Sequence, residues 1–195
     1  MAKQFWLMKT EPESFAIWDL ERVRIEPWSG VRNYMARANM RRMQIGDGVL
    51  FYHSSCDPPG VAGLASVIHT NVVDQTQFDP ESPYYDPKAK REKPTWDCVD
   101  VEYVSTFPNF VPIERMRGDP VLVDMMLLER GMRISVQPVT ESEYTRIVAL
   151  AETSWEPPPK PPKPKKPNKP KAKAKPKSKA RPKKPAKKPV KARRR

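Results

Sequence analysis

The sequence contains few of the residues from which metal sites and disulfide frameworks are built. Only two cysteines, Cys56 and Cys98, and two histidines, His53 and His69, occur in 195 residues. The cysteines lie far apart and no Cys-x-x-Cys spacing is present, so neither a zinc site nor a disulfide framework is expected. We therefore predict a protein that needs no metal and no cofactor.

Long apolar runs are also missing. The N-terminal segment MAKQFWLMK has too short an apolar stretch for a signal peptide, and no run reaches the roughly 20 apolar residues that span a bilayer. We expect no membrane partner. With so few cysteines, a reducing cytoplasmic setting is predicted, and association with the nucleoid is compatible with it.

Negative charge is almost absent from the last forty residues. The formal net charge is +13, and residues 156–195 hold 19 Lys and Arg against one acid, whereas residues 1–155 hold 17 basic and 22 acidic residues. Residues 156–195 also contain twelve prolines, and Val190 is their only aliphatic residue larger than alanine. We predict a folded domain over residues 1–155 and a disordered basic tail that binds phosphates without reading sequence.

Residues 1–155 alternate between strand-like and helix-like patterns. Strands are predicted over residues 5–9, 49–55, 61–69, 97–104 and 134–139, and helices over residues 14–22, 31–43 and 125–130. Thr140 and Glu143 form a capping-box sequence that predicts a last helix. Residues 79–94 read as a polar loop. Short strands with interspersed helices and no βα repeat predict an α+β domain built on a small barrel.

Two of the five tryptophans stand among polar neighbours. Trp28 lies in EPWSGVRN and Trp96 lies in EKPTWDC, each where a loop enters an element. An exposed indole at such a place can stack on a base, which contributes about 1–3 kcal/mol. The alternative is that both rings merely close the ends of the barrel.

Polar groups gather after Trp28. Gly30 permits close backbone approach, and Arg32 and Asn33 follow near the predicted start of a helix. Asn can pair with a base edge, and Arg can hold a phosphate or stack on a base. A helix cap with a surface salt bridge is the alternative interpretation.

Catalytic motifs are weaker. Lys9 and Glu11 could form an acid/base pair, although a structural ion pair is the commoner use of such residues. His53 and Ser54 are adjacent on a predicted strand and point to opposite faces, so they cannot easily act as a base and its nucleophile. No Gly-x-Ser-x-Gly elbow or phosphate-binding glycine loop is present. Binding is therefore favoured over catalysis.

Seven sequence blocks resemble the EVE domain family. They are FWLMKTEP, WSGVRNYMARANMRRM, GDGVLFYHSSC, PGVAGLASV, FDPESPYYDP, PTWDCVDVEYV and ISVQPVTESEY, and they occur in the family's order over about residues 4–151. The resemblance implies a PUA-like fold, a strongly bent barrel with flanking helices, related to YTH and ASCH domains. It also implies recognition of a modified base in DNA or RNA in an aromatic pocket.

The resemblance assigns pocket positions residue by residue. Those it implies, together with the polar neighbours of Trp28, are Trp28, Trp96, Asn33, Lys9, Glu11, Ser29, Arg32, Tyr52, His53, Ser54 and Tyr85. Two positions depart from the family. Thr10 stands where serine is usual, and Met35 stands where glutamine is common, so either change could alter which base fits.

These observations together predict a monomeric nucleic-acid-binding protein. The pocket would select a modified base, held between Trp28 and Trp96, and the tail would add affinity for phosphates. Two alternatives are a hydrolase or glycosylase acting on a modified nucleotide, and a scaffold in which only the tail binds.

Overall fold

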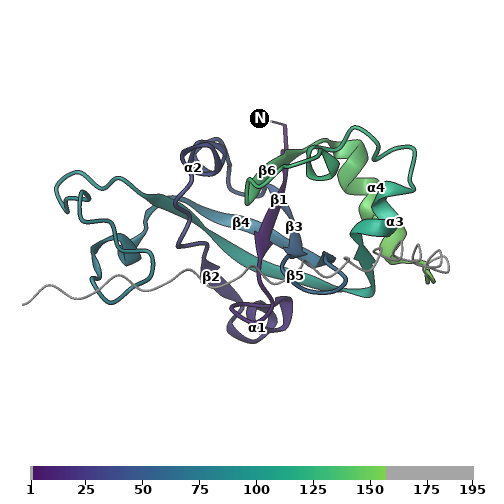
Figure 1. Cartoon of the computed structure of the whole chain (residues 1–195), viewed down its shortest axis with the longest axis horizontal. Coiled ribbons are helices and arrows are strands. Elements are labelled where there is room, and N and C mark those ends of the chain that lie inside the picture. Colours follow the sequence, from purple (N-terminus) through teal and green to yellow (C-terminus); the bar gives the residue numbers. More distant parts are fainter. Residues whose placement is uncertain (1, 157–195) are drawn as a thin grey trace, which may run out of the picture. The chain divides into compact units, whose positions relative to one another are not determined.

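The computed structural model describes residues 2–156, and the predicted disordered tail, from residue 157 on, lies outside the described residues. Six strands form one mixed sheet in the order β2-β5-β4-β3-β1-β6 (Figure 1). β1 (Phe5–Thr10) pairs in parallel with β3 (Gly48–His53), and all other neighbours are antiparallel. The predicted α+β class is confirmed.

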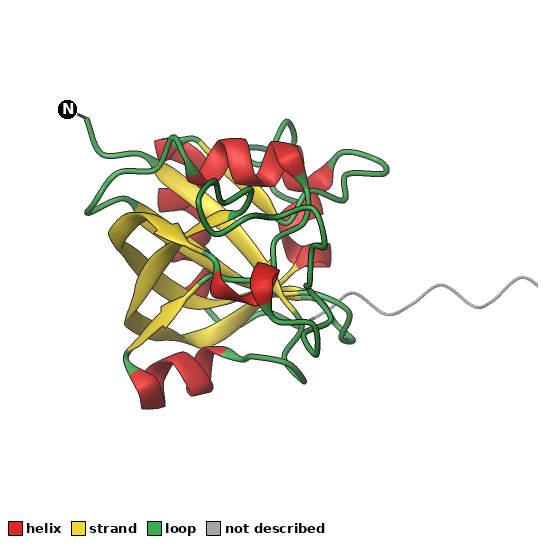
Figure 2. Ribbon diagram, turned by 90° about the vertical axis from the view of Figure 1, so that its left-hand side faces the viewer, coloured by secondary structure: helices red, strands yellow, loops and turns green. Residues whose placement is uncertain are grey.

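The two longest strands bend the sheet. β4 (Gly60–Val73) and β5 (Asp97–Pro112) are 14 and 16 residues long, and their pairing contains four register shifts. Such bulges increase local twist and turn the strand, and Figure 2 shows the strands curving around one another. The edge strands β2 (Ile25–Pro27) and β6 (Val136–Val139) do not pair with each other among residues 2–156, so the bent sheet stays open.

Apolar side chains cover both faces of the sheet's centre. In β1, Trp6 and Met8 belong to one buried cluster and Leu7 to the other, and in β3 Phe51 and Leu50 divide in the same way. This alternation follows from the two-residue period of a strand. It explains why every residue of β3 is buried. Helices α1 (Ile17–Val23) and α2 (Tyr34–Met40) contribute to the first cluster, and α4 (Glu141–Ala151) contributes to the second.

The last helix begins as its sequence predicts. Thr140 Oγ1 accepts a hydrogen bond from the Glu143 amide at 3.2 Å, and the Glu143 carboxylate accepts one from the Thr140 amide at 2.7 Å. α3 (Ile113–Arg117) lies beside the end of α4 (Figure 1), where Arg115 donates to the Thr153 carbonyl at 2.7 Å. α3, β2 and the second half of β5 have no counterpart in the sequence-based predictions.

The helix predicted over residues 125–130 is wrong. Only a 3-10 turn, η2 (Met126–Leu128), forms there, because Met125 and Leu127 are both buried and this spacing does not suit one face of an α-helix. Gly131 ends the segment with a left-handed φ of +84°. A second 3-10 turn, η1 (Gln75–Phe78), precedes the long loop that the sequence predicts.

Candidate functional site

A cleft of about 770 Å³ opens at the carboxyl end of β1. We call it the Trp28 cleft. Its walls come from the end of β1 with the following turn, from the connection between β2 and α2, and from Tyr84 and Arg133. It brings together four residues implied by the family resemblance, Lys9, Glu11, Trp28 and Ser54, and two of the polar neighbours of Trp28, Ser29 and Arg32.

Trp28 forms a wall of this cleft with the core behind it. Its amide donates to the Val99 carbonyl at 2.8 Å, which fixes it to the neighbouring strand. Its indole meets the Phe51 ring edge-on, with centroids 5.4 Å apart and planes at 84°. The side chain is only 7% exposed, so the ring is rigidly held and open to the cleft only at its margin.

Gly30 allows a second aromatic ring to reach the cleft. A Cβ atom at Gly30 would lie 2.7 Å from the Tyr84 ring, and the backbone there has a left-handed φ of +79°. The positive φ favours glycine, and any side chain at this position would displace the Tyr84 ring. Tyr84 is 45% exposed, its ring lies 5.7 Å from the Arg32 guanidinium, and its carbonyl accepts from Arg32 Nε at 2.7 Å. Sequence reasoning selected the neighbouring Tyr85, and no local signal distinguishes the two tyrosines.

Asp74 holds the cleft wall in place. Its buried carboxylate accepts from the Gly30 amide at 2.9 Å, from Arg32 Nη1 at 2.7 Å and from Thr76 Oγ1 at 2.6 Å. Burial alone would raise the pKa of Asp74, but the hydrogen bonds from Thr76, Arg32 and Gly30 outweigh burial and lower that pKa. Arg32 thus forms a salt bridge, as in the alternative interpretation of this segment, but its partner Asp74 is buried and not on the surface.

Replacing Asp74 with alanine is expected to lower the free energy of unfolding at neutral pH by about 2–3 kcal/mol, since charged hydrogen bonds are lost. Because the folded pKa is lowered, this contribution is present above the ordinary pKa of aspartate and is lost as pH falls through the folded value. Urea unfolding at several pH values measures both effects. Arg22→Ala is the control, because its ion pair with Asp19 is exposed to solvent and should contribute much less than the buried contacts of Asp74. Equal losses for the two variants would contradict the role of Asp74.

The structure does not bring Trp96 to the cleft, which corrects the predicted sandwich with Trp28. Trp96 is 5% exposed, and its Nε1 donates to Asp86 at 2.8 Å. The Tyr34 ring packs on it with centroids 4.9 Å apart, and the Arg37 guanidinium lies 5.4 Å from its centroid. Its polar sequence neighbours bond to α2 and the residue that follows it: the Thr95 carbonyl accepts from Arg37, and the Asp97 carboxylate accepts from Arg41.

Asn33 is also occupied elsewhere. Its Oδ1 accepts from the amides of Met35 and Ala36 at 2.9 and 3.0 Å, so it caps α2. The cap explains why α2 begins at Tyr34 and not at Val31. Met35 is 59% exposed on the outside of the helix. Asn33 therefore acts as the helix cap of the alternative interpretation, and it does not line the Trp28 cleft.

The residues proposed for acid/base chemistry are not assembled for it. Lys9 and Glu11 form no ion pair within the described chain, and Glu11 instead accepts from the Ser55 hydroxyl at 2.8 Å. His53 is 4% exposed, and its Nε2 accepts from the Ile17 amide at 3.1 Å. Burial lowers the pKa of His53, which favours the neutral ring. Ser54 donates its hydroxyl to a backbone carbonyl at 3.0 Å.

Two further predicted residues lie away from the cleft. Tyr52 belongs to the second core cluster and lines the groove beside the cleft, and burial raises the pKa of its hydroxyl to about 12. Tyr85 is exposed, and it lines neither the Trp28 cleft nor the groove beside it. Their contact with a base stays a prediction that the geometry does not support.

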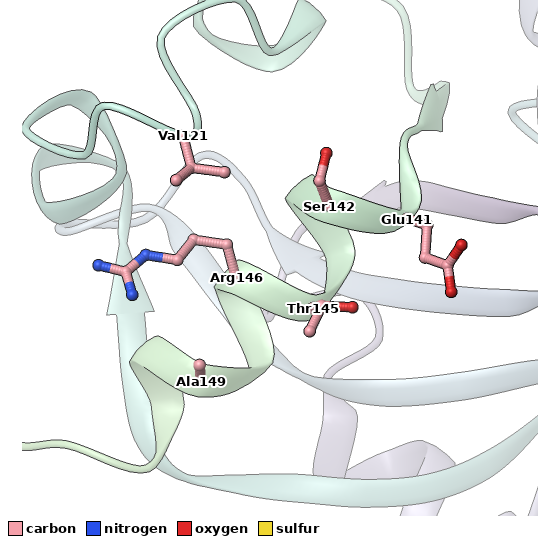
Figure 3. A pocket seen from close by; sticks show the side chains of 6 residues that line it. All are labelled: Val121, Glu141, Ser142, Thr145, Arg146 and Ala149. Carbon is pink, nitrogen blue, oxygen red and sulfur yellow. The ribbon is translucent and has the colours of Figure 1, made fainter.

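A groove of about 560 Å³ adjoins the cleft. We call it the Arg130 groove. Lys9, Ser54 and Arg133 line both hollows, and Arg117 and Arg130 line the groove alone. A separate shallow hollow lies on α4 (Figure 3), where Arg146 pairs with Asp119 at 2.7 Å. This hollow shares no lining residue with the other two.

Residues 2–156 contain no group of three or more His, Cys, Asp or Glu side chains placed to hold a metal ion. Over the same residues, no helix is long and apolar enough to cross a membrane. The residues that line the Trp28 cleft offer aromatic rings, hydroxyl groups, carboxylates and cations.

Comparison with known proteins places this geometry among related chains. The model of the EVE domain matches residues 4–150. Thymocyte nuclear protein 1 from Mus musculus is 40% identical over 169 residues, which cover 76% of this chain and 74% of the relative. A crystal structure of a Pseudomonas putida protein has 45% identity and a TM-score of 0.73, covering 75% of this chain and 99% of that one.

A second solved structure contains a ligand. Human THYN1 in complex with 5-methylcytosine containing DNA is 37% identical to this chain, with a TM-score of 0.73. The match covers 78% of this chain and 99% of that one.

Proposed function

Because the chain belongs to the EVE domain family, we propose that it binds nucleic acid and accommodates a modified base in the Trp28 cleft. The observation that carries this proposal is the cleft itself, with the fixed margin of Trp28 on one side and Tyr84 reaching over Gly30 on another. A flat ligand can meet aromatic rings there without further rearrangement of the core. The human relative bound to 5-methylcytosine containing DNA makes that base the first candidate.

The polar lining suits the edge of a cytosine. Glu26 lines the cleft, and burial, with a contribution from Asp100, raises the pKa of its carboxyl group. A carboxyl group accepts from the N4 amine of cytosine, and its protonated form can also donate to N3. Ser29 adds a hydroxyl group that can donate or accept, and the Thr10 hydroxyl, which donates to the Phe15 carbonyl at 3.1 Å, can still accept. The methyl group of the base would be placed by contact with the apolar lining, including Val31.

A binding role is favoured over the hydrolase or glycosylase alternative. Covalent or general-base chemistry needs a nucleophile and a base within hydrogen-bond reach of each other. His53 is committed to the Ile17 amide, and Glu11 is committed to Ser55. Of the residues considered for catalysis, Lys9 lines the cleft and has no carboxylate partner in the described chain. A single lysine does not form a catalytic pair.

The test is a panel of matched single and double strands that differ only in one cytosine, plain or 5-methylated. The full chain and residues 1–155 are titrated with each strand. We expect tighter binding to the methylated member in both proteins. Equal affinities for the plain and methylated members of every pair would contradict the proposal that the cleft recognises a modified base. Appearance of a free base or cleaved product in the same samples would favour the enzyme alternative.

A further inference from the structure

The Arg130 groove concentrates positive charge on a domain that is otherwise net acidic. Lys9, Arg117, Arg130 and Arg133 line it, and Glu129 is the one carboxylate among its lining residues. Residues 1–155 as a whole carry more acidic than basic side chains. The groove is thus a local exception to the charge of the folded part.

These four cations have no carboxylate partner in the described chain. The five ion pairs among residues 2–156 lie elsewhere and include Arg32 with Asp74, and Arg146 with Asp119. A guanidinium without an internal partner keeps its fork of donors free for an anion. The groove therefore offers hydrogen-bond donors to a ligand that carries negative charge.

Backbone contacts join the groove to the Trp28 cleft. The Lys9 amide donates to the Ser135 carbonyl at 2.8 Å, which places the segment before β6 against the end of β1. Lys9 is partly buried, with its Nζ 5.9 Å from the centroid of the Tyr52 ring, and burial lowers its pKa. A lysine in such surroundings gains from an external anion, because no internal carboxylate offsets its lost hydration.

We propose that the Arg130 groove binds the backbone phosphates next to the base held in the Trp28 cleft, with Arg117 and Arg130 as the principal contacts. This inference rests on the proposed function. A base is covalently tied to the phosphates beside it, so a strand that enters the cleft must leave along an adjoining surface. The shared wall of Lys9, Ser54 and Arg133 makes the groove such a surface.

The experiment uses the full chain and single strands with one central 5-methylcytosine. One phosphate at a time is replaced by an uncharged methylphosphonate, from two positions before the base to two positions after it, and once at a distant position. We expect replacement at one or two flanking positions to weaken binding about tenfold, the effect of a charge-assisted hydrogen bond. The distant replacement removes the same charge and controls for non-specific attraction by residues 156–195.

The second part of the experiment combines the phosphate replacements with substitutions in the protein, so that each contact is removed from either side and from both. Replacing a phosphate next to the base should no longer weaken binding in the variant Arg117→Gln with Arg130→Gln; we call this loss of affinity the flanking penalty. The preference of this variant for methylated over plain strands should remain. The matched control, Arg42→Gln with Arg91→Gln, removes equal charge outside both hollows and should keep the flanking penalty. A flanking penalty that is equal in all three proteins overturns the groove proposal alone. If the native chain shows no preference for methylated over plain strands, the proposed function is overturned instead.

Discussion

Deleting residues 156–195 is expected to weaken binding to plain duplex DNA by orders of magnitude and to flatten its dependence on salt. The deleted segment carries 19 basic residues and one acid, and the remaining chain is net acidic. Each phosphate contact contributes about 0.9 to the slope of log affinity against log salt on duplex DNA. If the chain loses six or more such contacts, the magnitude of the slope of log affinity against log salt should fall by about 5 or more.

Titrations at several salt concentrations measure this effect on the full and truncated chains. A full-length chain with the tail lysines and arginines replaced by glutamine is the matched control, because it keeps the length and removes the charge. It should behave like the truncated chain. If the truncated chain binds plain duplex with an unchanged slope, the tail is not the non-specific anchor. If truncation also abolishes binding to methylated strands, the scaffold alternative gains support and the cleft does not contribute.

Trp28→Leu is expected to remove most of the preference for a methylated base. The substitution deletes the aromatic margin of the cleft and keeps part of the buried apolar volume. Only the margin of the ring is exposed, so loss of this aromatic contact should reduce affinity for the selected base by about 1 kcal/mol, roughly fivefold, the lower end of the range for a base on an aromatic ring. Trp28 is also a core residue 7% exposed, so Trp28→Ala should lower the free energy of unfolding by about 3–5 kcal/mol.

Two tryptophans serve as controls for this result. Trp6 is 1% exposed and donates to Asp47 at 2.8 Å, so Trp6→Leu should lower stability without changing the preference of the folded protein. Trp96→Leu should act in the same way, because Tyr34 and Arg37 already cover its ring. Unfolding measurements and titrations of both strands are made on each variant. A preference that Trp96→Leu removes and Trp28→Leu keeps would reverse the assignment made from the structure.

Local sequence determined several features of this protein. The short apolar run of residues 5–9 predicts one strand, and the alternation in residues 97–104 predicts another because successive side chains point to opposite faces. β1 and β5 begin where expected. The Thr140 and Glu143 pair predicts the start of α4, because both hydrogen bonds span three residues. The seven family blocks point to the EVE domain, and the separation of charge between residues 1–155 and 156–195 is a property of composition alone.

Tertiary structure alone decided which of the candidate residues meet. Asp74 contacts Gly30 across 44 positions, and Arg32 contacts the Tyr84 carbonyl across 52. No pattern within a strand or helix encodes such distances, because they depend on how β4 and the loop that follows fold back beside α2. The same long-range packing covers Trp96 and leaves the margin of Trp28 open. It also gathers Lys9, Arg117 and Arg130 into one groove, although they are spread over more than a hundred residues of sequence.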